Sequence, residues 1–162
     1  MINNFKNSIS ILIPVFNASD QIFITLKSLE NINEIGEIII INDYSNKMNK
    51  LILDSISIKK VRVIDNKYVK GISGALNSGI EASLFEYIAR IDSGDICKDK
   101  KRFQKIIEIF SSNNEFNLIC SSLITDKNKI LNPRLHYVSE VLSPFTRVPH
   151  PTWVFKRELV KH

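Results

Sequence analysis

The sequence predicts an α/β protein built as an α/β/α sandwich, with a mostly parallel β-sheet and helices on both of its faces. Short apolar runs rich in β-branched residues alternate along the chain with segments whose apolar residues recur every three to four positions. One of these runs, Glu37–Asn42 (EIIIIN), is apolar almost throughout, as strands covered on both faces are. Regular alternation of strand and helix implies parallel strands joined by right-handed crossovers.

The first half of the chain is expected to hold three strands, with helices between them. The strands are Ile9–Val15, Glu37–Asn42 and Val61–Asp65. The first helix carries Ile22, Leu26 and Leu29 on one face, and Ser19 or Asp20 is placed to cap its start. A second helix is indicated by the spacing of Met48, Leu51, Ile52 and Ile56.

The same alternation continues in the second half as far as Thr125. A helix over Gly71–Ala82 has Ile72, Leu76 and Ile80 at helical spacing, with small residues between them for close packing, and a strand is expected over Tyr87–Ile91. The clearest helical stripe follows, and after it comes a strand candidate over Asn117–Leu123. The members of that stripe are Phe103, Ile106, Ile107 and Phe110.

Beyond Thr125 the pattern fades. Residues Asp126–Asn132 are polar and turn-like, and three prolines, Pro144, Pro149 and Pro151, oppose regular structure. Only Trp153–Phe155 is typical of a strand there, and Arg157–His162 is typical of the start of a helix. We therefore expect residues 1–162 to form one domain that is incomplete on its C-terminal side.

Composition limits the classes of function. With 162 residues, 44% hydrophobic and 24% charged, the chain is globular and has no apolar run long enough for a membrane span. Its N-terminus lacks the features of a secretory signal, and Cys97 and Cys120 fit no metal spacing. We expect reduced thiols in a cytoplasmic protein.

The net charge of +5 favours anionic partners, such as nucleotide phosphates or the lipid headgroups at the inner face of a membrane. We do not expect nucleic acid, because aromatic residues are not interleaved with basic ones. A basic cluster follows at Lys98, Lys100, Lys101, Arg102 and Lys105, and most of its members are expected to form the solvated face of the fourth helix, with one or two leaning towards phosphates.

Acidic residues follow two strands of this basic protein, at the edge where ligands of parallel sheets bind. Asp43 follows the second predicted strand, and Asp92 and Asp95 follow the fourth in a turn that contains Gly94. Two carboxylates in one turn suit a hard cation such as Mg²⁺ or Mn²⁺. The alternative is structural, with Asp92 ending a strand and Asp95 or Asp99 capping the next helix.

Familiar nucleotide and hydrolase motifs are absent from the sequence. It contains no G-x-G-x-x-G after the first strand, no P-loop and no G-x-S-x-G elbow. Gly71-Ile-Ser-Gly74 is better explained as a helix start close to the sheet. His136, His150 and His162 form no ligand pair.

Taken together, five segments resemble glycosyltransferase family 2, the inverting enzymes of GT-A fold that use nucleotide-diphosphate sugars. The segments, in the order of the family, are ISILIPVFNASDQIFITLKSL from Ile9, EIIIINDYSNK from Glu37, GISGALNSGIEAS from Gly71, YIARIDSGDICKDKKRF from Tyr87 and HPTWVFKREL from His150.

The resemblance implies a GT-A fold and a role for each matched position. The turn Pro14, Val15, Phe16, Asn17 would hold the nucleotide base, and Asp43 would accept a hydrogen bond from a uracil-type base. Asp95 would bind Mn²⁺ or Mg²⁺, with Asp92 assisting at the ribose or the metal.

The sequence departs from the family pattern in three places. These are the loop from Asn42 to Lys47, here called the base loop, the turn from Asp92 to Asp95, here called the acidic turn, and the C-terminal end. Asn42 and Lys47 stand where the family usually has Asp, and Gly94 stands where it often has a second Asp. The family's catalytic base follows the His-Pro-Thr strand, and this chain reaches His162 without it. Asp126 and Glu140 come too early in the order to inherit that role.

Two hypotheses follow. In the first, the chain is a nucleotide-sugar-binding domain of a transferase that builds a cell-surface polysaccharide on a glycan or lipid-linked acceptor. In the second, it is a non-catalytic module that binds a nucleotide or glycan, or docks onto a partner. A UDP-sugar is the expected donor, and peripheral contact with the inner membrane is a further expectation.

Overall fold

The computed structural model describes residues 7–17, 19–131 and 150–160. In this part of the chain, six strands form one sheet in the order β3-β2-β1-β4-β8-β5. Four of them are parallel and form one side of the sheet: β1 (Ile9–Val15), β2 (Ile35–Asn42), β3 (Val61–Asp65) and β4 (Tyr87–Arg90). Antiparallel β8 (Val154–Lys156) lies between β4 and β5 (Leu118–Ile119). The predicted mostly parallel sheet is confirmed.

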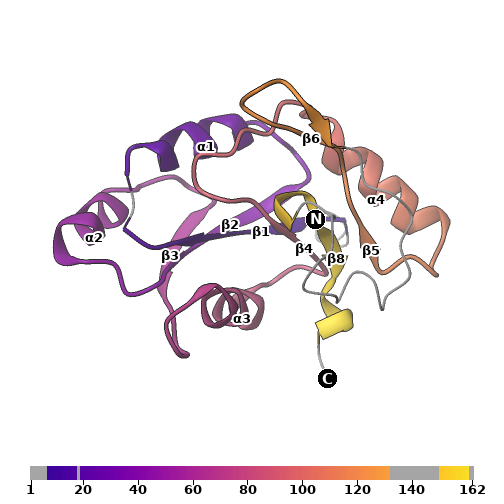
Figure 1. Ribbon diagram of the computed structural model, residues 1–162. Helices are drawn as coiled ribbons and strands as arrows, with labels where there is room; N and C mark the ends of the chain where they lie inside the picture. Colours follow the sequence, from indigo (N-terminus) through magenta and orange to yellow (C-terminus); the bar gives the residue numbers. More distant parts are fainter. Residues whose placement is uncertain (1–6, 18, 132–149, 161–162) are drawn as a thin grey trace.

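Helices cover both faces of this sheet, as Figure 1 shows. On one face lie α1 (Gln21–Leu29), α2 (Lys47–Asp54) and α4 (Arg102–Ser112), whose buried residues join one apolar cluster. On the other face lies α3 (Ile72–Ala82), which packs on a second, smaller cluster. The predicted α/β/α sandwich is therefore confirmed.

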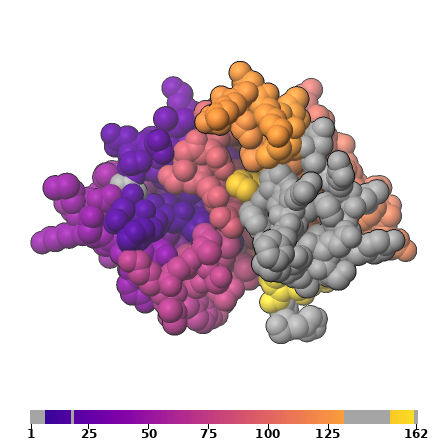
Figure 2. Space-filling model, in the orientation of Figure 1, coloured from indigo at the N-terminus to yellow at the C-terminus, as the bar shows by residue number. Residues whose placement is uncertain are grey.

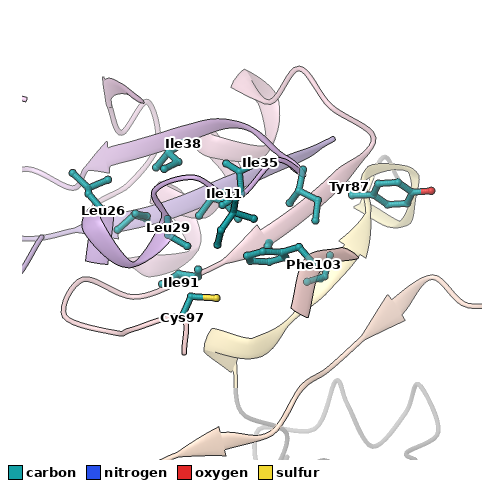
Figure 3. Packing of buried hydrophobic residues seen from close by; sticks show 14 of the residues in the cluster. Ile11, Leu26, Leu29, Ile35, Ile38, Tyr87, Ile91, Cys97 and Phe103 are labelled. Atoms are coloured by element: carbon teal, nitrogen blue, oxygen red, sulfur yellow. The ribbon is translucent and has the colours of Figure 1, made fainter. Parts of the chain in front are cut away.

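The larger cluster follows from the two-residue repeat of the strands. Ile11 and Ile13 of β1 point to the side of α1 and α4, whereas Leu12 between them joins the α3 side. Phe103 of α4 and Leu26 of α1 pack against this surface, as seen in Figure 3. Burying one such side chain stabilises the fold by roughly 1.5–3 kcal/mol. All four predicted stripe residues of α4 are buried.

The packing of α3 confirms the close packing predicted for its small residues, whereas its apolar stripe is buried only in part. Its buried residues are the small ones, Ala75, Ser78 and Gly79, whereas Ile72 is 46% exposed. A Cβ at Gly79 would lie 3.0 Å from side-chain atoms of Ile41 and Leu12. The helix therefore approaches the sheet along its small residues, as predicted, and Leu76 and Ile80 of the apolar stripe are partly buried against the smaller cluster.

Two details of the first two helices also correct the predictions. Neither predicted N-cap side chain caps α1: Asp20 makes no cap hydrogen bond, and it is the backbone carbonyl of Ser19 that accepts from the Ile22 N–H. In α2 the buried residue is Leu53, while Met48 is 76% exposed. Ile56 lies beyond the end of this helix.

The segment after α4 is the part that was predicted least well. Only Leu118–Ile119 of the predicted fifth strand is β5, and Leu123–Ile124 begins a hairpin, β6, that pairs with β7 (Ile130–Leu131). The strand predicted at Trp153–Phe155 is β8, and the helix predicted from Arg157 is a short 3-10 helix over Arg157–Val160. Another 3-10 helix covers His150–Thr152. Pro144, Pro149 and Glu140 lie outside the described residues.

Across the described ranges, no helix is both long and apolar enough to cross a membrane.

Candidate functional site

The loops after β1 and β2 meet at the carboxyl edge of the sheet and are joined by two hydrogen bonds. The Asn17 N–H donates to Ser45 Oγ at 2.9 Å, and the Asn46 N–H donates to Asn17 Oδ1 at 3.1 Å. Asn17 has a φ of 56°, in the left-handed region that Asn tolerates better than most residues. The side chain of Asn42 also accepts from the Ser45 N–H at 3.1 Å. These bonds fix the turn after β1 against the loop after β2.

Asp43 anchors the start of α3. Its side chain is only 7% exposed and accepts hydrogen bonds from Asn66 Nδ2 at 2.7 Å and from the Gly71 N–H at 2.9 and 3.1 Å to its two oxygens. A carboxylate has about four acceptor positions, so three bonds leave one of them available. Sequence reasoning identified Asp43 but missed Asn66 and Gly71, whose contacts with it are long-range.

An aromatic rim borders these loops. Phe16 is 53% exposed, and the ammonium of Lys70 lies 3.9 Å from the centre of its ring, within cation–π range. The Tyr44 hydroxyl donates to the Tyr68 carbonyl at 2.9 Å, which ties the loop after β2 to the loop after β3. The Lys70 loop itself lines an open groove of about 460 Å³ with the first turn of α3.

A second hollow, of about 290 Å³, connects the turn after β1 with the loop after β4. Its lining residues are Pro14, Val15, Phe16, Asn17, Ser19, Gln21, Asp92 and Ser93. The structure therefore brings together the predicted base-binding turn and Asp92. Asp43 and Asp95 are outside this lining. In Figure 2 the segment after β4 reaches the surface between the N-terminal part of the chain and the hairpin of β6 and β7.

The acidic turn is held in a specific backbone shape. The Asp95 N–H donates to the Asp92 carbonyl at 3.0 Å, and the Gly94 N–H donates to Thr25 Oγ1 of α1 at 2.8 Å. Gly94 has a φ of +98°, a conformation that side chains disfavour, and a Cβ there would lie 3.1 Å from Gln21 Oε1. The absence of the family's second Asp at this position thus suits the backbone of this turn.

The two carboxylates of the turn have different surroundings. Asp92 accepts two bonds from the Arg90 guanidinium, from Nε at 2.8 Å and from Nη2 at 3.1 Å. Burial raises the pKa of the Asp95 carboxyl, and the negative charge of Asp92 raises it further. Among the described residues, no lysine or arginine forms an ion pair with Asp95.

The capping alternative for Asp95 receives no support from the start of α4. It is Asp99 that accepts the Lys101 N–H at 2.9 Å, and its carbonyl accepts from the Arg102 N–H at 3.0 Å. The lysines at positions 98, 100, 101 and 105 are exposed, as predicted, although only Lys105 lies on α4, where it pairs with Asp99 at 2.9 Å. Arg102 does not join this solvated face, because it is half-buried and its Nη2 donates to the Thr152 carbonyl at 2.6 Å.

The donor set of the turn suits a hard cation only in part. No cluster of three or more His, Cys, Asp or Glu side chains fit for a metal ion occurs in the described residues. Asp92 and Asp95 supply carboxylate oxygens, the ligands that Mg²⁺ and Mn²⁺ prefer, and phosphate oxygens and water commonly complete such sites. The two residues therefore fit a cation that is shared with a diphosphate.

Cys97 and Cys120 are free thiols. Burial raises the pKa of Cys120 to about 11, so its thiolate is scarce at neutral pH. This environment is that of a structural rather than a reactive thiol.

Sequence reasoning also missed Arg90 and Lys70. Arg90 had a usable signal, because residues two apart in a strand point to the same side, so Arg90 was placed to meet Asp92. Lys70 had none, since its contact with Phe16 joins loops far apart in sequence.

Comparison with known proteins places these features in a family. The model of glycosyl transferase family 2 matches residues 10–157. An uncharacterized glycosyltransferase of Haemophilus influenzae is 32% identical over 118 residues, covering 71% of this chain and 36% of the relative. The Escherichia coli enzyme WfaP, named as a UDP-Glc:α-D-GlcNAc-diphosphoundecaprenol β-1,3-glucosyltransferase, is 26% identical over 165 residues, covering 82% of this chain and 66% of the relative. The chain thus spans between about a third and two thirds of these relatives.

Solved structures share the fold. Residues 1–349 of TarS from S. aureus, in complex with UDP, superpose with a TM-score of 0.70 at 17% identity, covering 95% of this chain and 48% of that TarS fragment. The mannosyltransferase PcManGT from Pyrobaculum calidifontis, in complex with GDP-Man and Mn²⁺, gives a TM-score of 0.68 at 14% identity, covering 93% and 45%. At such identities the likeness shows the GT-A fold alone.

Proposed function

This chain belongs to glycosyltransferase family 2, and on that premise we propose that it binds the donor of a sugar-transfer reaction. The donor is a nucleotide-diphosphate sugar, with UDP as the expected nucleotide, and the sugar is transferred with inversion to a glycan or lipid-linked acceptor. The observation that carries this proposal is the hollow shared by the turn after β1 and Asp92, at the carboxyl edge where parallel sheets bind ligands.

The base is proposed to lie at the turn Pro14–Asn17. Phe16 offers an exposed ring, and the bonds of Asn17 to the loop after β2 keep that turn close to Asp43. Asp43 retains one acceptor position after its bonds to Asn66 and Gly71, enough for a single N–H of a uracil-type base. Asp43 would then both hold the loops and accept from the base.

The diphosphate is proposed to lie over the acidic turn. Asp95 would be the direct ligand of Mn²⁺ or Mg²⁺, and Asp92 would assist at the ribose or the metal. When bound, such a cation offsets the negative charge that develops on the leaving diphosphate. Gly94 and Thr25 hold the turn in place, and the hollow beside Asp92 leaves room for the ligand.

The acceptor is proposed to be lipid-linked. The support is the name of WfaP, which contains the lipid-linked sugar α-D-GlcNAc-diphosphoundecaprenol, together with the exposed lysines Lys98, Lys100 and Lys101 after the acidic turn. These cations suit peripheral contact with anionic headgroups at the cytoplasmic face of a membrane. No catalytic base is assigned, and Asp126 accepts the N–H of the next residue in the turn of the hairpin.

The test is calorimetric titration of the chain with UDP, GDP, CDP and dTDP in the presence of Mn²⁺. We expect saturable binding of UDP, tighter than that of the other three nucleotides. Absence of binding to all four would contradict the proposal, and equal binding of all four would contradict the assignment of uracil.

A variant tests the base loop separately. Asp43→Ala is expected to weaken UDP binding about tenfold or more, both with and without Mn²⁺, because a hydrogen bond to a charged group contributes about 1.5–3 kcal/mol. Asp126→Ala, which removes an exposed acid of the hairpin, is the matched control and should bind UDP as the wild type does. Unchanged affinity in Asp43→Ala, with the protein folded, would overturn the role of Asp43 at the base.

A further inference from the structure

A positive charge is fixed inside the acidic turn. The Arg90 guanidinium forms a fork with Asp92, with Nε 2.8 Å from Oδ1 and Nη2 3.1 Å from Oδ2. The Arg90 side chain is 21% exposed and that of Asp92 is 37% exposed, so solvent screens the pair only in part. A bidentate pair fixes geometry as well as charge.

The backbone of Arg90 is equally constrained. It is the last residue of β4 and pairs with Leu12 of β1. Its N–H donates to the carbonyl of Trp153 at 3.3 Å, beside β8. The guanidinium therefore projects from the sheet rather than from a loop, and its position depends little on the rest of the turn.

This arrangement sets the local charge. The turn holds two carboxylates, and the Arg90 guanidinium pairs with Asp92 alone, so the charge of Asp95 is left without a paired cation among the described residues. A divalent cation that approaches the turn alone is attracted by that charge and repelled by Arg90. A diphosphate bound beside the turn adds negative charge, so the attraction of the cation then outweighs its repulsion by Arg90.

We propose that Arg90 is a positioning residue that fixes the Asp92 carboxylate and makes divalent-cation binding depend on a bound nucleotide diphosphate. The inference rests on the proposed function, since it assumes that the acidic turn receives a cation and a diphosphate. By thermodynamic linkage, the nucleotide tightens the cation by the same factor as the cation tightens the nucleotide. The consequence is a site that takes up metal together with its donor.

The test is titration of the full chain with Mn²⁺, followed by electron paramagnetic resonance, with and without saturating UDP. The wild type is expected to bind Mn²⁺ weakly alone and more tightly with UDP. In Arg90→Gln, which keeps a hydrogen-bonding side chain without the charge, Mn²⁺ affinity without UDP should rise about tenfold, as expected for one partly screened charge. The strengthening of Mn²⁺ binding by UDP should fall by a similar factor.

Two variants separate the charge of Arg90 from its packing. Arg90→Lys keeps a positive charge beside Asp92 and should restore weak Mn²⁺ binding in the absence of UDP. Lys105→Gln removes a charge from the nearby pair with Asp99 and should leave Mn²⁺ binding unchanged. Thermal unfolding of each variant checks that the fold persists, and a purely structural role for Arg90 predicts no gain in Mn²⁺ affinity.

The outcomes distinguish the inference from the proposed function. If the wild type binds Mn²⁺ and UDP cooperatively but Arg90→Gln shows no gain in Mn²⁺ affinity without UDP, the role of Arg90 is overturned and the donor site stands. If UDP binds but does not alter Mn²⁺ affinity, the coupling is absent and the inference fails. If UDP does not bind at all, the proposed function fails with it.

Discussion

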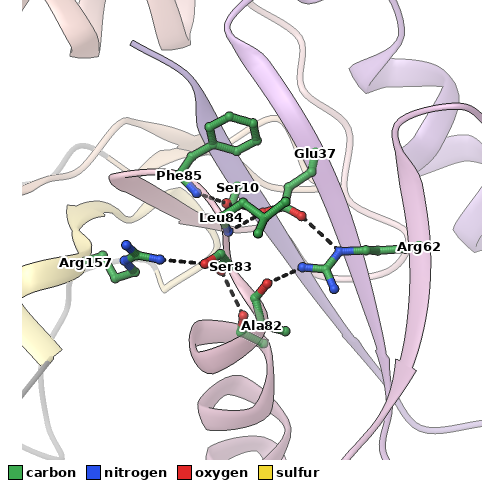
Figure 4. Close-up of polar contacts among 9 residues, drawn as sticks. Ser10, Glu37, Arg62, Ala82, Ser83, Leu84, Phe85 and Arg157 are labelled. Carbon is green, nitrogen blue, oxygen red and sulfur yellow. Dashed lines mark hydrogen bonds and ion pairs between the residues drawn. The ribbon is translucent and has the colours of Figure 1, made fainter. Parts of the chain in front are cut away.

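Glu37 and the pair Asp92 and Asp95 lie near opposite edges of the same sheet and have opposite surroundings. At the edge where the parallel strands begin, Glu37 is 5% exposed and accepts bonds from Ser10 Oγ at 2.7 Å, Arg62 Nε at 2.9 Å and the Leu84 N–H at 2.7 Å (Figure 4). At the edge where they end, Asp92 is 37% exposed beside Asp95, which pairs with no described cation.

The contacts around Glu37 continue through Arg62 and Ser83 to neighbouring elements. Arg62 also donates to the Ala82 carbonyl, and Arg157 donates to the Ser83 carbonyl at 2.6 Å (Figure 4). These bonds join the end of α3 and the segment after β8 to the sheet. A buried carboxylate that accepts only from the protein's own groups holds the structure together, whereas a more exposed carboxylate beside a hollow can also bind a ligand.

The largest effect on stability is expected from Glu37→Ala. Removing the carboxylate leaves Arg62, the Ser10 hydroxyl and the Leu84 N–H without their shared acceptor, and we expect a loss of about 3 kcal/mol in the free energy of unfolding. Urea denaturation measures this loss. Glu30→Ala, which removes an exposed acid at the end of α1, is the control and should change stability by less than about 0.5 kcal/mol.

The UDP affinity of Glu37→Ala tests whether Glu37 has a structural role alone. The folded Glu37→Ala protein should bind UDP as the wild type does, because Glu37 lies at the opposite edge of the sheet from the proposed donor site. The contrast between Glu37 and the acidic turn would be contradicted if Glu37→Ala lost less than about 1 kcal/mol of stability. It would also be contradicted if the folded variant bound UDP much more weakly than the wild type.

A smaller effect is expected at Asp65, which is exposed but paired at the ligand edge. Its pKa is lowered by the hydrogen bond from Asn42, and the nearby Lys50 lowers it further. Because its folded pKa is below its unfolded value of 3.8, Asp65 contributes stability above that value and loses it as the pH falls through the folded pKa. Solvent screens this exposed group, so the contribution at pH 7 is a few tenths of a kcal/mol, on the order seen for surface pairs.

Asp65→Asn tests this sign. Its midpoint of thermal unfolding should lie slightly below that of the wild type at pH 7, and the two should converge as the pH falls below 3.8 and through the folded pKa of Asp65. A difference that grows toward low pH would show that the sign is wrong.

Local patterns in the sequence predicted the frame of the molecule. The β-branched runs at Ile9–Val15 and Val61–Asp65 are strands, and the stripe that contains Phe103 and Phe110 is buried. The errors come from packing. Ala75 and Gly79 of α3 are buried by the close approach that their small size predicts, but Ile72 and Met48 are exposed, because apolar spacing does not reveal how far each helix face turns towards the sheet.

The site shows the same division between local and long-range information. Asp92 and Asp95 share a short turn, so their spacing was enough to predict that they lie together. The partners of Asp43 were not predictable in this way, because the Gly71 N–H reaches it across 28 positions of sequence. Such contacts depend on the relative positions of strands and helices, which only the folded chain supplies.

The measurement that tests the central claim most directly is calorimetric titration with UDP, with and without Mn²⁺, of the wild type and of Asp95→Asn. The wild type should bind UDP more tightly with Mn²⁺, and Asp95→Asn should lose that gain while keeping the metal-free affinity and at least wild-type stability. If Mn²⁺ strengthened UDP binding equally in both proteins, the account would be contradicted, because the Asp95 carboxylate would then have no part in binding the cation.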